Sequence, residues 1–469
     1  MTESETDLRL DTAAHIPAAA TGAYPARGGN RVRPLVDGEP AFRRICEAVE
    51  AAQHSVWLTV AFINEDFEMP DGRGSLFEVL DRAAARGIDV RAIFWRVNAE
   101  SRRVEAATFS GSPAQREMLA ARGSRFRIRW DRAQKGYCQH QKSWLIDAGR
   151  AGEVAFVGGI NLGRNDVVAP GHRILNGEAH THDVYVEVAG PSASDVHHNF
   201  VQRWNGASDR DAADGTWGHS GDDALGFPER VSAPAGDSRV QIQRTIRAGL
   251  YAGAHPCAGG EAFDIAAGEL SIAEQYGLAI AAARRSIYIE NQTVFAPEML
   301  DALKAALERG VEVVALTPAE AYGELRAARQ RPESRPLFDQ LAALGAYERF
   351  ALVGIAGADA AGGRHNVYVH AKIMLIDDAW LTIGSCNIAK RSFFGDSEIN
   401  ATVWDPAVVR ALRCELLAEH LDVDTSGMDD RAALALYRRI AADNRAKRDS
   451  GAGDWQGNAF TLDPAAYGQ

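Results

Sequence analysis

Paired cysteines and long apolar runs are both missing from this 469-residue sequence. Its five cysteines (Cys46, Cys138, Cys257, Cys386 and Cys414) stand far apart and form no CxxC pair. This spacing argues against a disulfide framework and against a structural zinc site, so we expect reduced thiols in a cytoplasmic protein. No apolar stretch is long enough to span a bilayer, and the acidic N-terminus lacks a secretory signal pattern. We therefore expect a soluble chain that contacts a membrane at most peripherally.

Basic residues are fewer than acidic residues in this sequence. Lysine and arginine number 51 against 63 aspartates and glutamates, which gives a net charge of −12. Nucleic-acid binding depends on basic side chains that neutralise phosphates, so this balance makes a nucleic-acid partner unlikely. Adsorption to anionic lipid through bulk charge is disfavoured for the same reason.

The sequence contains an internal repeat. The segment LFEVLDRAAARGIDVRAIFWR begins at Leu76, and MLDALKAALERGVEVVALTP begins at Met299. In both, apolar residues at helical spacing are followed by Arg-Gly and then by an alternating apolar strand, and Gly87 and Gly310 stand where a helix C-cap is expected. Strand-like segments precede both units. Each half is thus predicted as β-α-β, a loop and a further strand, which indicates an α/β fold with a central sheet.

The repeat and the composition together predict the domain boundaries. Residues 207–238 are rich in Gly, Asp, Ser and Pro and are the expected linker between the halves. The full division is an N-terminal extension (1–30), a first half (31–206), the linker (207–238), a second half (239–449) and a C-terminal tail (450–469). By composition, both ends are expected to be loosely packed.

Each half carries one HxKxxxxD motif, HQKSWLID from His140 and HAKIMLID from His370. Because alternate side chains share one face of a strand, His140 and Lys142 can point into one cleft, as can His370 and Lys372. Asp147 and Asp377 fall at the ends of these strands.

Two His-Lys pairs match the needs of phosphodiester cleavage without a metal. The reaction needs a nucleophile, an acid for the leaving alcohol, and positive charge around the phosphoryl oxygens. One histidine can attack phosphorus, the other can protonate the leaving oxygen, and the lysines can hold the anionic oxygens. A single motif could not supply all three, so the motifs are two halves of one site.

Further polar residues recur after each motif. GGIN ends at Asn161 and GSCN ends at Asn387, where an amide could contact phosphate or merely cap a turn. Ser385, within GSCN, is a weaker candidate for phosphate contact. Asp183 and Glu398 follow, and each could fix a histidine tautomer or be an ordinary strand-end charge.

The double motif with these downstream residues resembles the phospholipase D superfamily, from about Leu35 to Glu419. The resemblance implies two similar α/β/α sandwich domains with central mixed sheets, related by a pseudo-twofold axis, with one active site at their interface. It implies that His140 is the nucleophile and His370 the acid/base, and that Asp147 and Asp377 are mainly structural. It implies carboxylates at Asp183 and Glu398 that orient the histidines, with the pairing left open, and neither a metal nor a cofactor.

Some segments resemble true phospholipases D more narrowly, among them YIENQ at Tyr288 and RSFFGDSEIN at Arg391. The first hypothesis is therefore hydrolysis or exchange of a glycerophospholipid headgroup, with water or an alcohol as acceptor. The alternatives are a cardiolipin synthase-like phosphatidyl transferase, a nuclease of the superfamily, and an inert binding module. The duplication already completes the site, so an oligomer is not required.

Other conspicuous residues receive a plainer interpretation. The HTHD segment from His180 to Asp183, together with His197 and His198, matches no strong metal-ligand spacing, so a solvated loop is expected there. Phe393 and Phe394 could meet an acyl chain at the cleft mouth or pack in the core. Residues 290–292 end a strand and are candidates to line the pocket.

Overall fold

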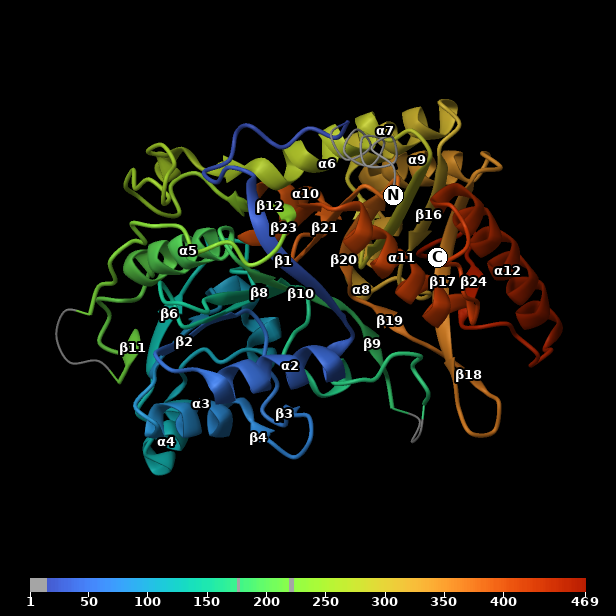
Figure 1. Cartoon of the computed structure of the whole chain (residues 1–469). Coiled ribbons are helices and arrows are strands. Elements are labelled where there is room, and N and C mark those ends of the chain that lie inside the picture. Colours follow the sequence, from blue (N-terminus) through green and yellow to red (C-terminus); the bar gives the residue numbers. More distant parts are fainter. Residues whose placement is uncertain (1–14, 175–177, 219–222) are drawn as a thin grey trace.

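Two sheets with the same strand order form the frame of the protein (Figure 1). The structure is a computed structural model that describes residues 15–174, 178–218 and 223–469. The first sheet runs β11-β6-β5-β2-β7-β8-β10-β1, and the second runs β24-β17-β16-β14-β20-β21-β23-β12. In both, the two parallel pairings lie toward one edge and the remaining pairings are antiparallel. The predicted α/β duplication is confirmed.

The elements of the first half are as follows: β1 (Arg27–Val36), α2 (Gly38–Ala51), β2 (Ser55–Val60), β3 (Glu68–Met69), β4 (Gly74–Ser75), α3 (Leu76–Ala85), β5 (Asp89–Trp95), η1 (Ala99–Ala107), α4 (Pro113–Arg122), β6 (Arg127–Asp131), β7 (Ser143–Ile146), β8 (Val154–Gly158), η2 (Arg164–Asp166), β9 (Thr181–His182), β10 (Val184–Ala189), α5 (Ala193–Gly206) and β11 (Thr216–Trp217).

The elements of the second half are as follows: β12 (Ser238–Ile246), η3 (Ile265–Ala267), β13 (Glu269–Leu270), α6 (Ser271–Ala282), β14 (Ser286–Asn291), β15 (Val294–Phe295), α7 (Pro297–Glu308), β16 (Glu312–Leu316), α8 (Gly323–Arg329), η4 (Pro332–Ser334), α9 (Arg335–Leu344), β17 (Phe350–Ala358), β18 (Arg364–Asn366), β19 (Tyr368–Val369), β20 (Lys372–Ile376), β21 (Trp380–Gly384), β22 (Ile388–Ala389), α10 (Lys390–Phe394), β23 (Glu398–Trp404), α11 (Pro406–Leu421), α12 (Asp430–Ser450) and β24 (Ala459–Thr461).

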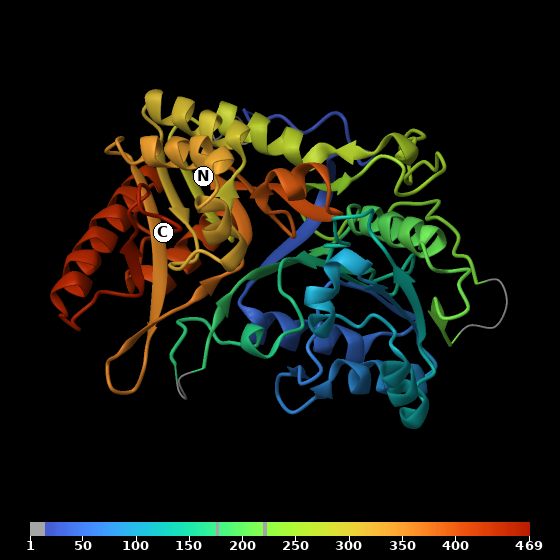
Figure 2. The same cartoon turned by 180° about the vertical axis from the view of Figure 1, so that it is seen from behind.

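Strand β1 joins the two sheets. It is antiparallel to β10 over Arg31–Val36, and its first residues pair with β12, with Arg27 opposite Val240 and Asn30 opposite Ser238. Figure 1 shows it running from one half to the other. Figure 2 shows the helices that cover the outer faces from behind. The two motif-bearing halves are therefore held edge to edge by main-chain hydrogen bonds.

The repeated helix-to-strand turns are built alike. Gly87 and Gly310 have φ of 86° and 85°, and each amide donates to the carbonyl three residues back. The next residues, Ile88 and Val311, donate to Ala83 and Ala306 and close the same helix end in both halves. Glycine suits this left-handed position because it carries no Cβ, so the predicted C-caps are confirmed.

The described parts of both ends, residues 15–30 and 450–469, differ from the expectation of loose packing, while residues 1–14 lie outside the described residues. Ile16 and Tyr24 are 1% exposed, and the carbonyl of Ile16 accepts a hydrogen bond from the Trp404 indole of the second half. At the other end, β24 pairs with β17, and Tyr467 is buried against Thr317. Composition predicted loose packing because these segments are rich in alanine and glycine, but a few large apolar side chains in them are buried against the rest of the protein. Among the described residues, no helix has both the length and the apolar character needed to cross a bilayer.

The two motif aspartates hold backbone rather than face a cleft. Asp147 accepts from the amides of Gln53, His54 and Ser55 at the start of β2, at 2.6 to 3.1 Å. Asp377 accepts from the amides of residues 284–286 at the start of β14, at 2.8 to 2.9 Å. Both have positive φ, 54° and 57°. These contacts support the structural role that the resemblance implied.

Replacing Asp147 by alanine is expected to lower the free energy of unfolding by about 3 kcal/mol, since three amides lose a charged acceptor. Turnover of the folded enzyme should stay within about threefold, because no contact with the catalytic side chains is lost. Denaturant unfolding followed by fluorescence measures the first quantity, and a rate below the transition measures the second. Asp147→Asn, which keeps one acceptor oxygen, should lose less stability. Lost turnover at unchanged stability would contradict the structural role.

Candidate active site

The motif histidines lie just before their strands, not within them as predicted. β7 begins at Ser143 and β20 at Lys372, whereas His140 and His370 precede them in extended segments. The amide of His140 donates to the carbonyl of Ser397 in the second half at 3.0 Å. The amide of His370 donates to the carbonyl of His182 in the first half at 2.8 Å. These contacts, together with the parallel pairing of β19 with β9, bring the motif segments of the two halves together.

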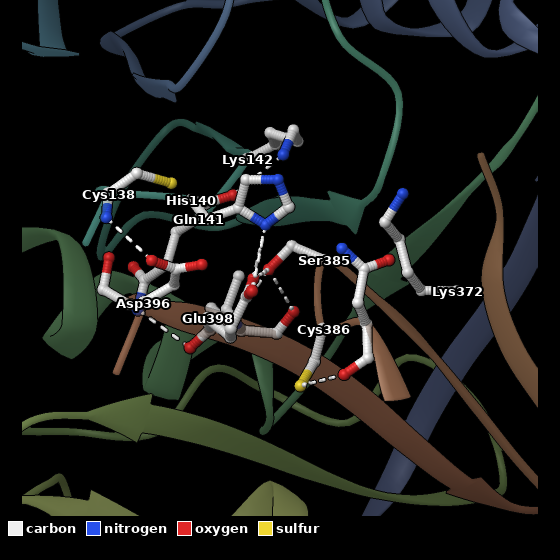
Figure 3. Close-up of polar contacts among 12 residues, drawn as sticks. Cys138, His140, Gln141, Lys142, Lys372, Ser385, Cys386, Asp396 and Glu398 are labelled. Atoms are coloured by element: carbon white, nitrogen blue, oxygen red, sulfur yellow. Dashed lines mark hydrogen bonds and ion pairs between the residues drawn. The ribbon is translucent and has the colours of Figure 1, made fainter. Parts of the chain in front are cut away.

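Each histidine is oriented by a carboxylate from the opposite half. His140 Nδ1 lies 3.0 and 2.9 Å from the two oxygens of Glu398, and His370 Nδ1 lies 2.6 Å from Asp183 Oδ2. Figure 3 shows the His140 ring pointing at Glu398. With Nδ1 bound to a carboxylate, Nε2 of each ring is left for the substrate. The pairing that the sequence left open is thus crossed: neither half can form a working histidine alone.

The second residue of the GSCN segment and of the GGIN segment lies against one of the orienting carboxylates. Ser385 Oγ donates to Glu398 Oε2 at 2.5 Å and is fully buried (Figure 3). Ser385 is therefore occupied by the carboxylate, which argues against the weaker idea that it binds phosphate. At the equivalent position, a Cβ on Gly159 would stand 2.4 Å from Asp183 Oδ1, so only glycine leaves room for that carboxylate.

The two lysines are buried and lie close to their histidines in the chain. Lys142 Nζ donates to the carbonyl of His140 at 2.9 Å, and Lys372 Nζ donates to the carbonyl of His370. Burial lowers the pKa of both ammonium groups, although Glu398 and Asp183 oppose this, and the pKa of Lys372 falls to about 7. Buried cations favour an anionic partner, which a phosphodiester supplies.

Burial, followed by repulsion from the two lysines, holds the pKa of both motif histidines well below the usual range. The neutral imidazole is therefore the favoured form of His140 and His370. Burial raises the pKa of Glu398 to about 7 and that of Asp183 to about 6. A neutral imidazole with its Nδ1–H directed at a carboxylate carries the lone pair of Nε2, the form a nucleophile requires.

The motif asparagines have unused hydrogen-bonding capacity. The side-chain oxygens of Asn161 and Asn387 are buried without a hydrogen-bond partner among the described residues. Asn387 lines the cleft that contains His140. These oxygens are acceptors and do not test whether the amide N–H groups donate to phosphate, so that contact stays a prediction.

A cleft of about 410 Å³ opens beside His140 between the two halves. Its wall includes side chains from both: Phe62, Trp95, Glu100, Ser101, Arg103, Val104, Cys138, Gln292, Thr293, Tyr322, Glu324, Asn387, Arg391, Ser392 and Asp396. Arg103 and Glu324 form an ion pair between the halves.

Of residues 290–292, which were expected to line the pocket, Gln292 lines the cleft, while Glu290 is fully buried beside His182. Phe393 is buried in the core and Phe394 is 45% exposed.

Sequence reasoning missed Asp396. Its Oδ1 accepts from the amide of Cys138 at 2.8 Å (Figure 3), so it holds the segment that leads to His140. Its Oδ2 binds Arg391 at 2.7 Å. Burial raises its pKa to about 6. The signal was its position in RSFFGDSEIN, two residues before Glu398.

The expectation of a solvated loop at the histidine-rich segments is wrong. His182 and Asp183 are 0% and 1% exposed, and His197 and His198 are 6% and 1% exposed on α5. Polar composition suggested solvent, but these side chains meet buried partners: His197 pairs with Glu153, and His198 lies beside Tyr24.

Comparison with known proteins finds similar sequences and one similar fold. Residues 278–419 match the family model described as cardiolipin synthase, phospholipase D-like domain. Phospholipase D A of Dictyostelium discoideum is 24% identical over 81% of this chain and 33% of its own length. Cardiolipin synthase 1 of Staphylococcus epidermidis is 24% identical over 82% and 66%, respectively.

The chain is similar to proteins of the phospholipase D superfamily. Cardiolipin synthase A of Pseudomonas aeruginosa is also 24% identical, over 89% of this chain and 72% of its own. The crystal structure of a phosphatidylserine synthase of Haemophilus influenzae shares the superfamily fold, with a TM-score of 0.54 at 12% identity over 95% of this chain and 99% of that one. The chain spans about a third of the Dictyostelium protein and about two thirds of the staphylococcal one.

Proposed function

We propose that the protein is a phosphatidyl transferase that cleaves a glycerophospholipid phosphodiester and passes the phosphatidyl group to an alcohol, with water as the competing acceptor. The crossed pairs His140–Glu398 and His370–Asp183 carry the proposal, because they set two neutral imidazoles with free Nε2 atoms beside two buried lysines. The similarity to cardiolipin synthases favours transfer over the headgroup hydrolysis that the phospholipase-like segments first suggested.

The reaction proceeds in two displacements. His140 Nε2 attacks phosphorus, the bond to the leaving oxygen breaks, and His370 Nε2–H gives that oxygen its proton. The acceptor alcohol then gives its proton to His370 as its oxygen attacks, and the bond from phosphorus to His140 breaks. A bound phosphodiester anion offsets the repulsion from Lys142 and Lys372, which raises the pKa of His370 and loads it with the proton it must donate.

Product analysis tests the acceptor. The protein is incubated in detergent micelles with phosphatidylglycerol, and the lipids are identified by mass spectrometry. Release of glycerol with formation of cardiolipin is expected, and His140→Ala should form none. Cleavage of a nucleotide diester without any lipid turnover would overturn the proposal.

A second candidate is hydrolysis of phosphatidylcholine to phosphatidic acid. The cleft carries the aromatic rings of Phe62, Trp95 and Tyr322 together with the carboxylates of Glu100 and Glu324. Rings and carboxylates of this kind attract quaternary ammonium groups. The same assay run with phosphatidylcholine separates the two, since choline release without lipid transfer supports hydrolysis.

The pH dependence of kcat/KM should peak near neutrality. Below a pKa of about 7, Glu398 takes up a proton and no longer accepts from His140, so kcat/KM falls toward acid. Above a pKa of about 7, Lys372 loses its charge, so kcat/KM falls toward alkali. Lys372→Arg should move the alkaline limb upward and leave the acid limb in place, because a guanidinium stays charged. Rates measured from about pH 5 to pH 9 would show both limbs, and an unmoved alkaline limb would contradict the role of Lys372.

A further inference from the structure

A second polar cluster is buried behind His370, where the two halves meet. Asp37 lies between β1 and α2, His172 precedes β9, and His182 is in β9, while Glu419 comes from α11 of the second half (Figure 1). The side chains of the first three are 0% exposed and that of Glu419 is 5% exposed. The catalytic steps proposed above use none of these four side chains.

The four residues present donor atoms to a common point. His182 Nδ1 lies 2.9 Å from Asp37 Oδ1 and 3.2 Å from His172 Nε2. His172 Nε2 lies 3.2 Å from Glu419 Oε1 and 3.5 Å from Asp37 Oδ2. A tetrahedral Zn²⁺ site with bonds of about 2.0 to 2.1 Å has ligand atoms about 3.4 Å apart, which is close to these separations.

Hydrogen bonds alone satisfy this cluster poorly. His172 Nε2 has Asp37, His182 and Glu419 within reach, and one N–H can serve only one of them. Asp37 Oδ2 and Glu419 Oε2, oxygens of the two carboxylates in the cluster, are buried without a hydrogen-bond partner among the described residues. Unpaired buried polar atoms cost about 1 to 3 kcal/mol each, so their concentration here points to a missing ligand.

We infer that this cluster is a structural site for a divalent d-block cation, with Zn²⁺ as the best match, bound by His172 Nε2, His182 Nδ1 and the carboxylates of Asp37 and Glu419. Mixed imidazole and carboxylate donors suit this class of ion, and two carboxylates neutralise its charge. His182 Nε2 lies 2.8 Å from Glu290, the outer carboxylate that commonly orients a metal-bound histidine. Four protein ligands in a buried cluster leave a tetrahedral ion no open coordination position, so this site is separate from the reaction and from the proposed function.

The ion would link the two halves next to the catalytic histidine. Three ligands come from the first half and Glu419 comes from the second. The carbonyl of His182 accepts from the amides of His370 at 2.8 Å and Ala371 at 3.1 Å, so a fixed His182 also fixes the segment that carries His370. Loss of the ion should therefore loosen the junction of the halves before it affects either core.

Metal analysis of the full-length, untagged protein tests the site. Protein stripped with a chelator and dialysed against ZnCl₂ should retain one Zn²⁺ per chain by mass spectrometry and melt at a higher temperature than the stripped form. His172→Gln and Glu419→Gln should lose both the retained zinc and the rise in melting temperature. His365→Gln, which alters a half-exposed histidine outside the cluster, should keep both.

Cobalt provides a readout that does not depend on the variants folding. Co²⁺ added to stripped wild-type protein should give the strong visible absorption of tetrahedral coordination by nitrogen and oxygen donors. Stripped wild-type protein that neither retains Zn²⁺ nor melts at a higher temperature with it would overturn the site. So would zinc retained in full by folded His172→Gln and Glu419→Gln.

Discussion

Protein with His370 replaced by alanine is expected to accumulate a phosphoryl adduct on His140, while its turnover of a natural lipid falls by about 10,000-fold or more. Removal of His370 takes away the acid for the leaving alcohol and the base for the acceptor. A substrate with a nitrophenol leaving group needs no acid, so His140 can still attack it. The adduct then persists because no base activates the acceptor. Intact-protein and peptide mass spectrometry locate it.

The matching variant gives the opposite pattern. His140→Ala should lose turnover to a similar extent and form no adduct on either histidine, because the attacking Nε2 is gone. His365→Gln controls for general phosphorylation of histidine, since its side chain is half-exposed and outside the cleft. An adduct that appears on His370 in the His140→Ala protein would reverse the two assignments.

The repeated α/β fold of this protein could be predicted from the sequence, because the patterns that indicate it involve residues close together in the chain. The Arg-Gly turns at Gly87 and Gly310 depend on a few neighbouring residues, and both end their helices as predicted. The spacing from His140 to Asp147 likewise fixes which residue ends a strand. Because the same patterns occur in both halves, each occurrence supports the prediction made from the other.

What the sequence could not reveal depends on contacts between distant residues. Nothing local indicates that Glu398 belongs with His140, which precedes it by 258 residues. The buried cluster of Asp37, His172, His182 and Glu419 is spread over both halves and follows no ligand spacing. The burial of Ile16 against the second half was hidden for the same reason. Each of these depends on how the two halves pack against each other, which is a property of the whole chain.

The crossed carboxylates explain why both halves are needed. A single half keeps its histidine, lysine and asparagine but lacks the carboxylate that holds Nδ1, so its imidazole is free to rotate and to change tautomer. Position 385 in one half and 159 in the other differ accordingly: Ser385 binds Glu398, and Gly159 leaves room for Asp183. The repeat has diverged where two different carboxylates must fit.

Glu398→Gln is therefore expected to lower kcat by about 1,000- to 10,000-fold, the scale found when the carboxylate of a His-carboxylate pair is replaced by an amide. The amide can donate to His140 Nδ1, which favours the tautomer whose proton sits on Nε2, and a protonated Nε2 cannot attack phosphorus. Substrate affinity should change little, because Glu398 lies behind the ring. Single-turnover measurements should show slow adduct formation.

Two further variants make this test specific. Asp183→Asn should act on the other histidine, so its adduct on His140 should form with an activated substrate but turn over slowly. Ser385→Ala removes only the hydrogen bond to Glu398 and should lower kcat by about tenfold or less, as expected for one hydrogen bond of about 1 kcal/mol. A Glu398→Gln enzyme no slower than Ser385→Ala would show that Glu398 does not set the tautomer of His140.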